Sequence, residues 1–445
     1  MDWTWNKSNI NRNKLVSIYT IVAIIYETDS ACFVDHVAAI NQSVEDVGLR
    51  CPGDAFLFAK HGKFTAGKCD VDEIHKRKEE NTITNSSQGV ELMSRDSSTR
   101  EGDTEDNVEL KCEEKPKKRK RKRKQPLNVG ELKMLQYHQK HSPFITRAKD
   151  EIVLTDAIKE HLSKLQGTLN LAGQQSINST EPFDELTEGC NEEGCCKLKD
   201  CHILNASNNF LTSIFDRKII NPRNKAIIMN YDNKDYVIPK KSSFVVSEFR
   251  NWVFQCDSLG EKYDLIVMDP PWENKSAKRK KSYNYLPEYD LKKLPIDKIL
   301  HNGGLVVVWV TNKQKYLEFV RDVLFPFWGV ELLGHWHWVK IGVDGDYITN
   351  IYSTQRKPYE PVLIGRKVPK LTSCEKVPEN RIICSVPLNQ HSRKPPLNQI
   401  LEPFLPRNPR CLEMFARSLT PEWDSWGNET IKFQNLSCYV KKEVA

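Results

Sequence analysis

The chain has 445 residues, of which 39% are hydrophobic, so its length and composition allow two or three domains with at least one sizeable core. The net charge is +7, but the run KPKKRKRKRK at Lys115–Lys124 holds nine positive charges, and without them the rest carries −2. This near-neutral remainder excludes a nucleic-acid grip through bulk charge. Thirteen cysteines, an odd number scattered over a long chain, indicate a reducing compartment rather than a disulfide framework.

Residues 1–69 are predicted to form a β-rich N-terminal region. The apolar run Leu15–Tyr26 follows basic residues as a signal peptide would, but it is too short to span a bilayer. Its β-branched content, and the patch Ala31–Val34 after a turn-like segment, predict a β-hairpin. Residues 54–64 form another strand-like patch.

Residues 70–125 are predicted to be a disordered linker, because they contain few large apolar side chains to offset the entropy of ordering. The basic run Lys115–Lys124 lies within it. Such a run suits nuclear import or non-specific phosphate attraction, and otherwise it is a solvated charge run. We expect a nuclear protein, with the cytoplasm as a second location, and no membrane association.

Residues 126–220 are predicted to form a helical middle region. Val129–His138 and Ile152–Leu165 both show apolar residues at helical spacing. A cysteine cluster follows, and its thiols either hold a zinc ion or are free thiols in a loop; the spacing differs from paired CxxC knuckles. Its members are Cys190, Cys195, Cys196 and Cys201, with His202 beside them.

A catalytic domain is predicted over residues 221–440, centred on the sequence YDLIVMDPPW at Tyr263–Trp272. Leu265–Met268 is a short apolar run typical of a strand buried on both faces of a parallel sheet. Asp269 then places a carboxylate at the edge of the sheet where open α/β folds bind ligands. The two prolines that follow, Pro270 and Pro271, place rigid carbonyl oxygens at the same edge. Trp272 adds a plane on which a base can stack.

This cluster of acceptors suits an exocyclic amine on a heterocycle. Hydrogen bonds from the amine to Asp269 and to the Pro270 carbonyl favour a pyramidal nitrogen whose lone pair can attack an electrophilic methyl group. No metal is required. Orientation of this kind supplies on the order of 7–11 kcal/mol in well-aligned cases.

A basic and aromatic loop follows at residues 273–289, which suits a flipped base and its phosphates. The alternative is a solvated flexible loop. Asn312, with Thr311, is expected to cap a helix after the next buried strand. The candidate substrate-binding residues are Lys278, Arg279, Lys281, Tyr283, Tyr285 and Asn312.

The other expected elements alternate between strands and helices, as a Rossmann-like sheet demands. His335 and His337 share one face of an expected strand, where packing is favoured over metal binding. The strands are Tyr236–Ile238, Ser243–Phe249, Leu305–Val310, Val330–Val339, Pro361–Ile364 and Cys411–Ala416, and the helices are Leu291–Ile299, Lys313–Leu324 (ended by Pro326) and Leu397–Leu405.

The DPPW motif and the segments HSRKPP and CLEMFAR resemble the adenine-N6 methyltransferases that use S-adenosylmethionine on RNA or DNA, the family of the mRNA adenosine methyltransferase. The resemblance covers roughly residues 220 to 440. It implies an α/β, Rossmann-like S-adenosylmethionine-dependent methyltransferase fold, with accessory N-terminal β-rich and helical regions. It also accounts for the absence of any G-x-G loop in the chain, an absence that disfavours NAD or ATP chemistry.

The resemblance further implies roles for individual residues. Lys394 matches a lysine beside the donor, and Tyr283 matches an aromatic residue that contacts the target adenosine. Glu429 stands where many relatives have Gln, so it only accepts hydrogen bonds. The implied donor-binding residues are Ser247 and Glu248, which match loosely, and Asp269, Lys394, Arg417, Gly427, Asn428 and Glu429.

Three functions follow from these observations. The first is methyl transfer from S-adenosyl-L-methionine to adenine N6, for which the resemblance implies adenosine or 2′-O-methyladenosine of U2 small nuclear RNA, with DNA adenine as the rival substrate. The second is a catalytically silent RNA-binding scaffold, which the intact DPPW motif disfavours. The third is methylation of another amide or amine, such as a glutamine side chain. We expect a monomer, with the N-terminal regions filling the place of a partner.

Overall fold

The computed structural model describes residues 23–51, 128–172, 201–205, 209–249, 251–252, 261–273, 286–353, 356–368, 375–388 and 393–441. The described residues of 23–51 and 129–441 belong to one compact unit. Several predicted features lie outside the described residues, namely the strand-like patch 54–64, the basic run 115–124, Cys190, Cys195 and Cys196, and the loop residues 274–285. The predicted domain boundaries at 69, 125 and 220 stay predictions.

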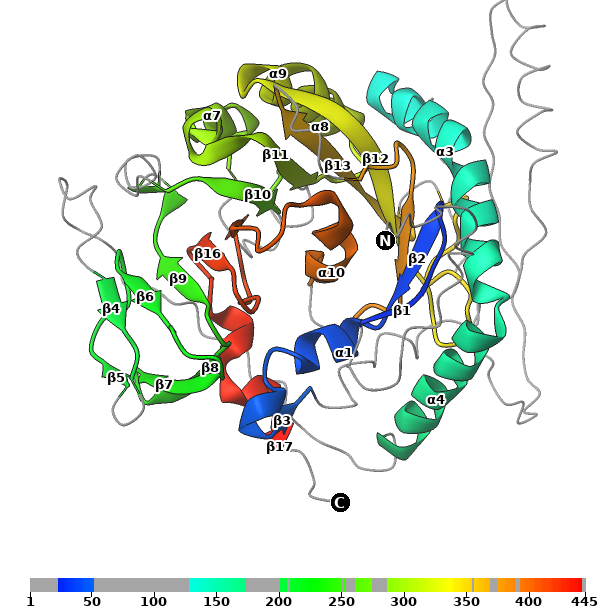
Figure 1. Cartoon of the computed structure of the whole chain (residues 1–445). Helices are drawn as coiled ribbons and strands as arrows, with labels where there is room; N and C mark the ends of the chain where they lie inside the picture. Colours follow the sequence, from blue (N-terminus) through cyan, green and yellow to red (C-terminus); the bar gives the residue numbers. More distant parts are fainter. Residues whose placement is uncertain are drawn as a thin grey trace, which may run out of the picture. The chain divides into compact units, whose positions relative to one another are not determined.

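A mixed sheet of twelve strands carries the fold among these residues (Figure 1). In sheet order its strands are β1 (Ile24–Glu27), β2 (Ala31–Val34), β14 (Ile382–Ser385), β12 (Val330–Lys340), β13 (Tyr359–Lys367), β11 (Leu300–Trp309), β10 (Tyr263–Met268), β15 (Cys411–Met414), β16 (Asp424–Gly427), β9 (Ser243–Val246), β6 (Lys218–Ile220) and β4 (Cys201–Ile203).

Strand β10 is buried on both faces, as its sequence predicts. Leu265 and Val267 belong to one hydrophobic cluster, whereas Ile266 and Met268 belong to another. The strand pairs in parallel with β11 on one side and with β15 on the other. The chain therefore continues from β10 to its neighbour β11 on one side and later returns to its neighbour β15 on the other side. Open α/β sheets bind ligands at this kind of switch point.

The sheet departs from a purely parallel arrangement beyond β11. The expected strand at Val330–Val339 is β12, but β12 is not the neighbour of β11. Strand β13 lies between them and pairs antiparallel with both. The expected strand Tyr236–Ile238 lies in β8 (Lys234–Ile238), which belongs to a separate three-stranded sheet with β5 (Phe210–Leu211) and β7 (Ile227–Tyr231).

The helix expected at Lys313–Leu324 is longer than predicted, because Pro326 does not end it. A π-helical turn at Val320–Leu324 joins two α-helical pieces, and Pro326 lies in the first turn of the second. A proline is tolerated there because no intrahelical hydrogen bond from its nitrogen is lost. The α-helices are α1 (His36–Asn41), α3 (Val129–Val153), α4 (Asp156–Ala172), α7 (Ile296–Ile299), α8 (Gln314–Phe319), α9 (Phe325–Phe327) and α10 (Asn398–Leu401).

Two further expected helices are only partly α-helical. Residues expected at Leu291–Ile299 form a 3-10 helix, Glu288–Lys293, followed by α7, and those at Leu397–Leu405 form α10 followed by the 3-10 helix Glu402–Phe404. Other 3-10 helices are Glu45–Val47, Lys432–Gln434 and Leu436–Cys438, and a small two-stranded sheet pairs β3 (Leu49–Arg50) with β17 (Val440–Lys441).

The N-terminal strands extend the main sheet. Strands β1 and β2 form an antiparallel hairpin that contains the end of the predicted run Leu15–Tyr26, whose residues 15–22 lie outside the described residues, and β2 pairs in parallel with β14. Helix α3 packs against β2, β14 and β12, and α4 packs against β1 (Figure 1). Among the described residues, no helix combines the length and the apolar character that crossing a membrane needs.

Candidate active site

The residues predicted to act together follow strand ends at one edge of the sheet. In the parallel register, Met268 of β10 lies beside Met414 of β15 and Val308 of β11, and Met414 lies beside Trp426 of β16. Gly427 then pairs with Val246 of β9. The carboxyl ends of all five strands therefore meet at this edge, and the residues that follow them include Asp269, Asn312, Arg417, Asn428, Glu429, Ser247 and Glu248.

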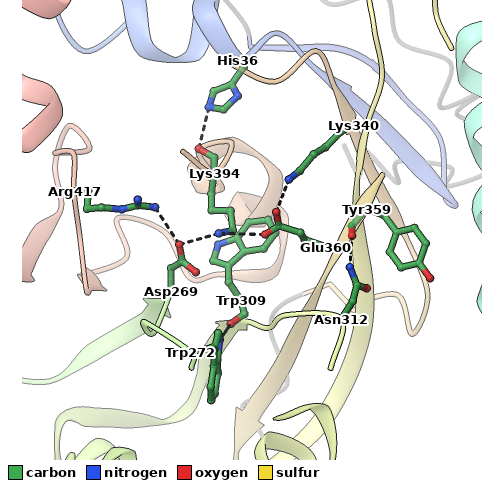
Figure 2. A network of polar contacts seen from close by, with 10 residues as sticks. All are labelled: His36, Asp269, Trp272, Trp309, Asn312, Lys340, Tyr359, Glu360, Lys394 and Arg417. Atoms are coloured by element: carbon green, nitrogen blue, oxygen red, sulfur yellow. Dashed lines mark hydrogen bonds and ion pairs between the residues drawn. The ribbon is translucent and has the colours of Figure 1, made fainter. Parts of the chain in front are cut away.

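Asp269 receives two cations at one oxygen. Its Oδ2 lies 2.9 Å from Lys394 Nζ and 3.3 Å from a terminal guanidinium nitrogen of Arg417 (Figure 2). The side chain is 20% exposed, so it faces a partly open space. Both ion pairs use Oδ2, so Oδ1 takes part in neither of them.

Lys394 is itself held by a second carboxylate that the sequence argument missed. Glu360 on β13 places Oε2 3.3 Å from Lys394 Nζ, and its Oε1 pairs with Lys340 of β12 (Figure 2). Burial favours a raised pKa for Glu360, but Lys394 and Lys340 outweigh it and hold the pKa well below its usual range. Burial favours a lowered pKa for Lys394, and Asp269 and Glu360 together raise it. The signal in the sequence was a glutamate directly before the apolar run Pro361–Ile364.

The N-terminal helix α1 also reaches this network. The imidazole of His36 is buried, and its Nε2 lies 2.9 Å from the backbone carbonyl oxygen of Lys394, to which it donates (Figure 2). Burial, with smaller contributions from Arg393 and Lys340, lowers the pKa of His36 to about 3, so the ring is neutral. His36, which is 358 positions from Lys394 in the sequence, thus fixes the backbone that carries the Lys394 ammonium.

The DPPW segment is anchored by its own backbone and by neighbouring strands. The Pro270 carbonyl accepts a hydrogen bond of 2.8 Å from the Trp272 backbone N–H, and one of its two lone pairs remains for another donor. Pro271 accepts from the Leu286 N–H at 3.3 Å. Trp272 donates from Nε1 to the Trp309 carbonyl at 2.8 Å.

Trp272 is buried, with 7% of its surface exposed, and its ring packs 4.8 Å from that of Tyr316 on α8. This packing holds the loop at the end of β10. The predicted stacking of Trp272 on a base stays a prediction.

Arg417 reaches Asp269 through a strained turn. Phe415, the residue after β15, has a φ of 61°, a left-handed conformation that is rare for a bulky side chain. Its ring stacks on Phe249 at 5.9 Å, which offsets part of this strain. Gly427 lies against the same turn, and a Cβ there would come within 2.6 Å of the Ala416 carbonyl oxygen. Close packing therefore explains this glycine, independently of any ligand.

The other predicted donor residues differ in what they contact. Ser247 is buried, and its hydroxyl donates to Asp216. Glu248 and Asn428 are exposed, and Glu429 pairs with Lys432. The role of these four residues in donor binding stays a prediction.

Of the predicted substrate residues, five lie outside the described residues: Lys278, Arg279, Lys281, Tyr283 and Tyr285. Asn312 is described, and its Nδ2 donates to the Tyr359 carbonyl at 2.6 Å. Its buried Oδ1 has no hydrogen-bond partner among the described residues. An acceptor of this kind at the end of β11 is suited to an N–H group of a ligand.

A cavity opens beside Asp269, with a volume of about 590 Å³ that includes space open to solvent. Its walls combine apolar and aromatic side chains with charges of both signs. A cavity of this size and mixture suits a zwitterionic ligand with a flat ring system. The charged residues that line it are Asp269, Arg393, Lys394, Glu413 and Arg417.

His335 and His337 contact α3 rather than the cavity. The Tyr137 hydroxyl lies 2.7 Å from Nε2 of each ring, and the two rings stack 4.8 Å apart. Their predicted role in packing is confirmed. Cys201, the described member of the cysteine cluster, is exposed on β4.

Comparison with known proteins agrees with this geometry. The profile of the MT-A70 family matches residues 263–429, from the start of β10 to Glu429. The chain is 32% identical over 337 residues to a human protein named N(6)-adenine-specific methyltransferase METTL4, a match that covers 71% of this chain and 70% of the human one. The chain belongs to the MT-A70 family. Members of this family are adenine-N6 methyltransferases that depend on S-adenosylmethionine, so the chain is such an enzyme.

Two other relatives have names that state different substrates, RNA for one and DNA for the other. An N6-methyladenosine RNA methyltransferase MTA1 of Pyricularia oryzae is 38% identical over 217 residues, which is 47% of this chain and 57% of the relative. A DNA N6-methyl methyltransferase of Caenorhabditis elegans is 35% identical over 216 residues, which is 48% of this chain and 58% of the relative. The chain thus spans under two thirds of these two relatives. His36 lies outside the residues that the family profile matches.

Proposed function

We propose that this MT-A70 enzyme methylates N6 of an adenosine in RNA, with adenosine or 2′-O-methyladenosine of U2 small nuclear RNA as its substrate. The observation that carries the chemistry is the placement of Asp269 and the Pro270 carbonyl at the switch point of the sheet, beside the cavity. The family resemblance supports the choice of small nuclear RNA. The name of the nematode relative supports the alternative substrate, adenine in DNA.

The cavity residues fit S-adenosylmethionine, which supplies an electrophilic sulfonium methyl group when bound. Lys394 and Arg417 are placed to attract its carboxylate, and Asp269 and Glu413 to attract its positive charges. Gly427 ends β16, and Asn428 and Glu429 follow it at the same edge, where we propose that these three residues contact its ribose. The Lys394 ammonium and the Arg417 guanidinium already lie beside Asp269, so the charges that would bind a charged ligand are in place before it arrives.

The amine of adenine needs acceptors that do not have to reorganise. Asp269 presents Oδ1, because Lys394 and Arg417 hold Oδ2. The Pro270 carbonyl has a second lone pair, and the Trp272 anchor fixes its direction. Two fixed acceptors orient the amine nitrogen for in-line attack, which is electrostatic preorganisation rather than proton abstraction in the first step.

The proposal also covers the location of the protein in the cell and its oligomeric state. The basic run Lys115–Lys124 supports import into the nucleus. We propose that the chain works as a monomer, because strands β1 and β2 extend the sheet beyond β14 and helix α3 packs against this part of it.

The test uses purified full-length protein and a labelled methyl donor. Four oligonucleotides of one sequence would be compared. Three are RNA and carry the target as adenosine, as 2′-O-methyladenosine, or as N6-methyladenosine for a blank, and the fourth is DNA with deoxyadenosine as the target. Mass spectrometry of the digested nucleosides should show N6-methylation of RNA that is lost in Asp269→Ala. Preference for the DNA oligonucleotide would overturn the RNA assignment. Native protein that incorporates no label above the blank would support the scaffold function instead, and label that is undiminished in Asp269→Ala would overturn the role of Asp269.

A further inference from the structure

Glu413 is a half-buried carboxylate that the methyl-transfer step itself does not use. It lies on β15, opposite Val267 of β10 in the parallel register. Its strand neighbours Leu412 and Met414 point to the other face of the sheet, into a different hydrophobic cluster. Glu413 therefore shares a face with Val267 and, two residues further, with Asp269, and all three line the cavity.

The charged groups that face Glu413 come from three elements. Asp269 follows β10 and brings a like charge, and Arg417 follows β15 and brings an opposite charge. The segment before α10 contributes Arg393 and Lys394 to the same cavity wall. Lys394 and Arg417 are already engaged with Asp269, and Lys394 also with Glu360. The cationic side chains of this wall are thus shared among several acids.

Two carboxylates in one cavity are costly when both are ionised and no ligand is bound. A ligand with a net positive charge removes that cost. S-adenosylmethionine carries a sulfonium, an ammonium and a carboxylate, whereas its demethylated product, S-adenosylhomocysteine, lacks the sulfonium charge and is neutral overall. The occupant of the cavity therefore changes its charge by one unit in each catalytic cycle.

We propose that Glu413 is a proton-linked binding group: it is ionised when the cationic donor fills the cavity and protonated when the neutral product does. This inference rests on the proposed binding of the donor in this cavity. It makes the site favour donor over product, because only the donor supplies the charge that keeps both carboxylates ionised.

The ionisation of Glu413 lies in the right range for this role. Burial raises its pKa, and the Asp269 carboxylate raises it further, to about 7, against the opposing effect of Arg417 and Arg393. A bound cation lowers that pKa again. Donor binding near neutral pH then releases a proton, so the affinity for the donor rises with pH until Glu413 is ionised in the free protein as well.

The experiment is isothermal titration of the full-length chain with S-adenosylmethionine and with S-adenosylhomocysteine between pH 6 and pH 8. Both ligands carry an α-amino group, but the sulfonium of the donor lowers the pKa of its own amine. The protonation of each free ligand is therefore measured separately and subtracted before the two pH dependences are compared. We expect the donor affinity to rise about tenfold more than the product affinity over this range, as one linked proton predicts. In Glu413→Gln the two ligands should show the same pH dependence.

Two controls separate the possible failures. Glu402→Gln makes the same change at an exposed position outside the cavity and should behave as the native chain. Titrations of the native chain at pH 7 in two buffers of different ionisation enthalpy count the released protons without any variant, and more should be released by the donor than by the product. Equal proton release, or a Glu413→Gln protein that keeps the native difference, would overturn the inference while leaving donor binding intact. A native chain that binds neither ligand would overturn the proposed function and this inference together.

Discussion

The two sides of strand β10 are built in different ways. On one side, β15, β16 and β9 follow in parallel, and each strand end delivers a short segment to the ligand edge. On the other side, beyond β11, the antiparallel strands β13 and β12 bring Glu360 and Lys340 behind Lys394, and α1 brings His36. The first side presents groups to the ligand, whereas the second side holds those groups in place. Variants on the two sides should therefore fail in different ways.

The largest effect is expected at Asp269, where both sides meet. Asp269→Asn keeps the shape but loses the charge that Lys394 and Arg417 pair with, and it weakens one of the two acceptors for the amine. Turnover of an adenosine oligonucleotide should fall roughly 10²–10³-fold, the usual range for one preorganised electrostatic group. Asp322→Asn, which alters an exposed ion pair with Arg321, is the control. Full activity in Asp269→Asn would contradict the site.

Lys394→Met should have the second-largest effect, a loss of affinity for the methyl donor. It removes the ammonium between Asp269 and Glu360 and keeps most of the apolar stem. Donor affinity, measured by titration, should fall about 10–100-fold, since a hydrogen bond to a charged group contributes about 1.5–3 kcal/mol. A loss confined to the RNA affinity would instead place Lys394 on the substrate side.

Glu360→Gln tests the supporting side through stability and pH. The pKa of Glu360 is lowered in the folded chain, so its ion pairs stabilise the fold above the pKa of the unfolded carboxyl, and this stability is lost as pH falls. With the side chain 26% exposed, the variant should lose about 1–2 kcal/mol of unfolding free energy at pH 7. The difference between the two denaturant curves should begin to shrink as pH falls below about 4, the unfolded pKa, and should keep shrinking toward the lowered pKa of the folded chain. A gap that stays constant well below about pH 4 would assign the effect to packing.

The smallest effect is expected at His36. His36→Ala removes one buried neutral hydrogen bond, so the KM for the donor should rise roughly two- to tenfold with kcat nearly unchanged. His36→Gln, whose amide can donate to the same carbonyl, should recover most of the loss, and His301→Ala at an exposed position is the control. Because the pKa of His36 is lowered to about 3, the effect should not vary between pH 6 and pH 9. No change in either variant would limit α1 to packing.

The presenting side was largely predictable, because its information is local. A continuous apolar run ending at Asp269 specifies a strand buried on both faces, and the carboxyl end of such a strand is where ligands bind in open α/β sheets. Arg417 directly follows the expected strand Cys411–Ala416, so its approach to Asp269 needed only parallel pairing. Gly427–Glu429 were assigned through the family resemblance, because the strand β16 was not predicted. The same reasoning failed at β12, because β13 inserts antiparallel between it and β11 and nothing in the local pattern announces that order.

The sequence by itself determined the acceptor cluster of the DPPW segment, the buried strand before it and the amphipathic faces of α3 and α4. Tertiary structure alone decided that Glu360, Lys340 and His36 stand behind Lys394, and that Glu413 faces the same cavity as Asp269. Local patterns record which side chains avoid water. The partner of a buried charge depends instead on which strands lie side by side, and that is settled by the order and direction of the whole sheet.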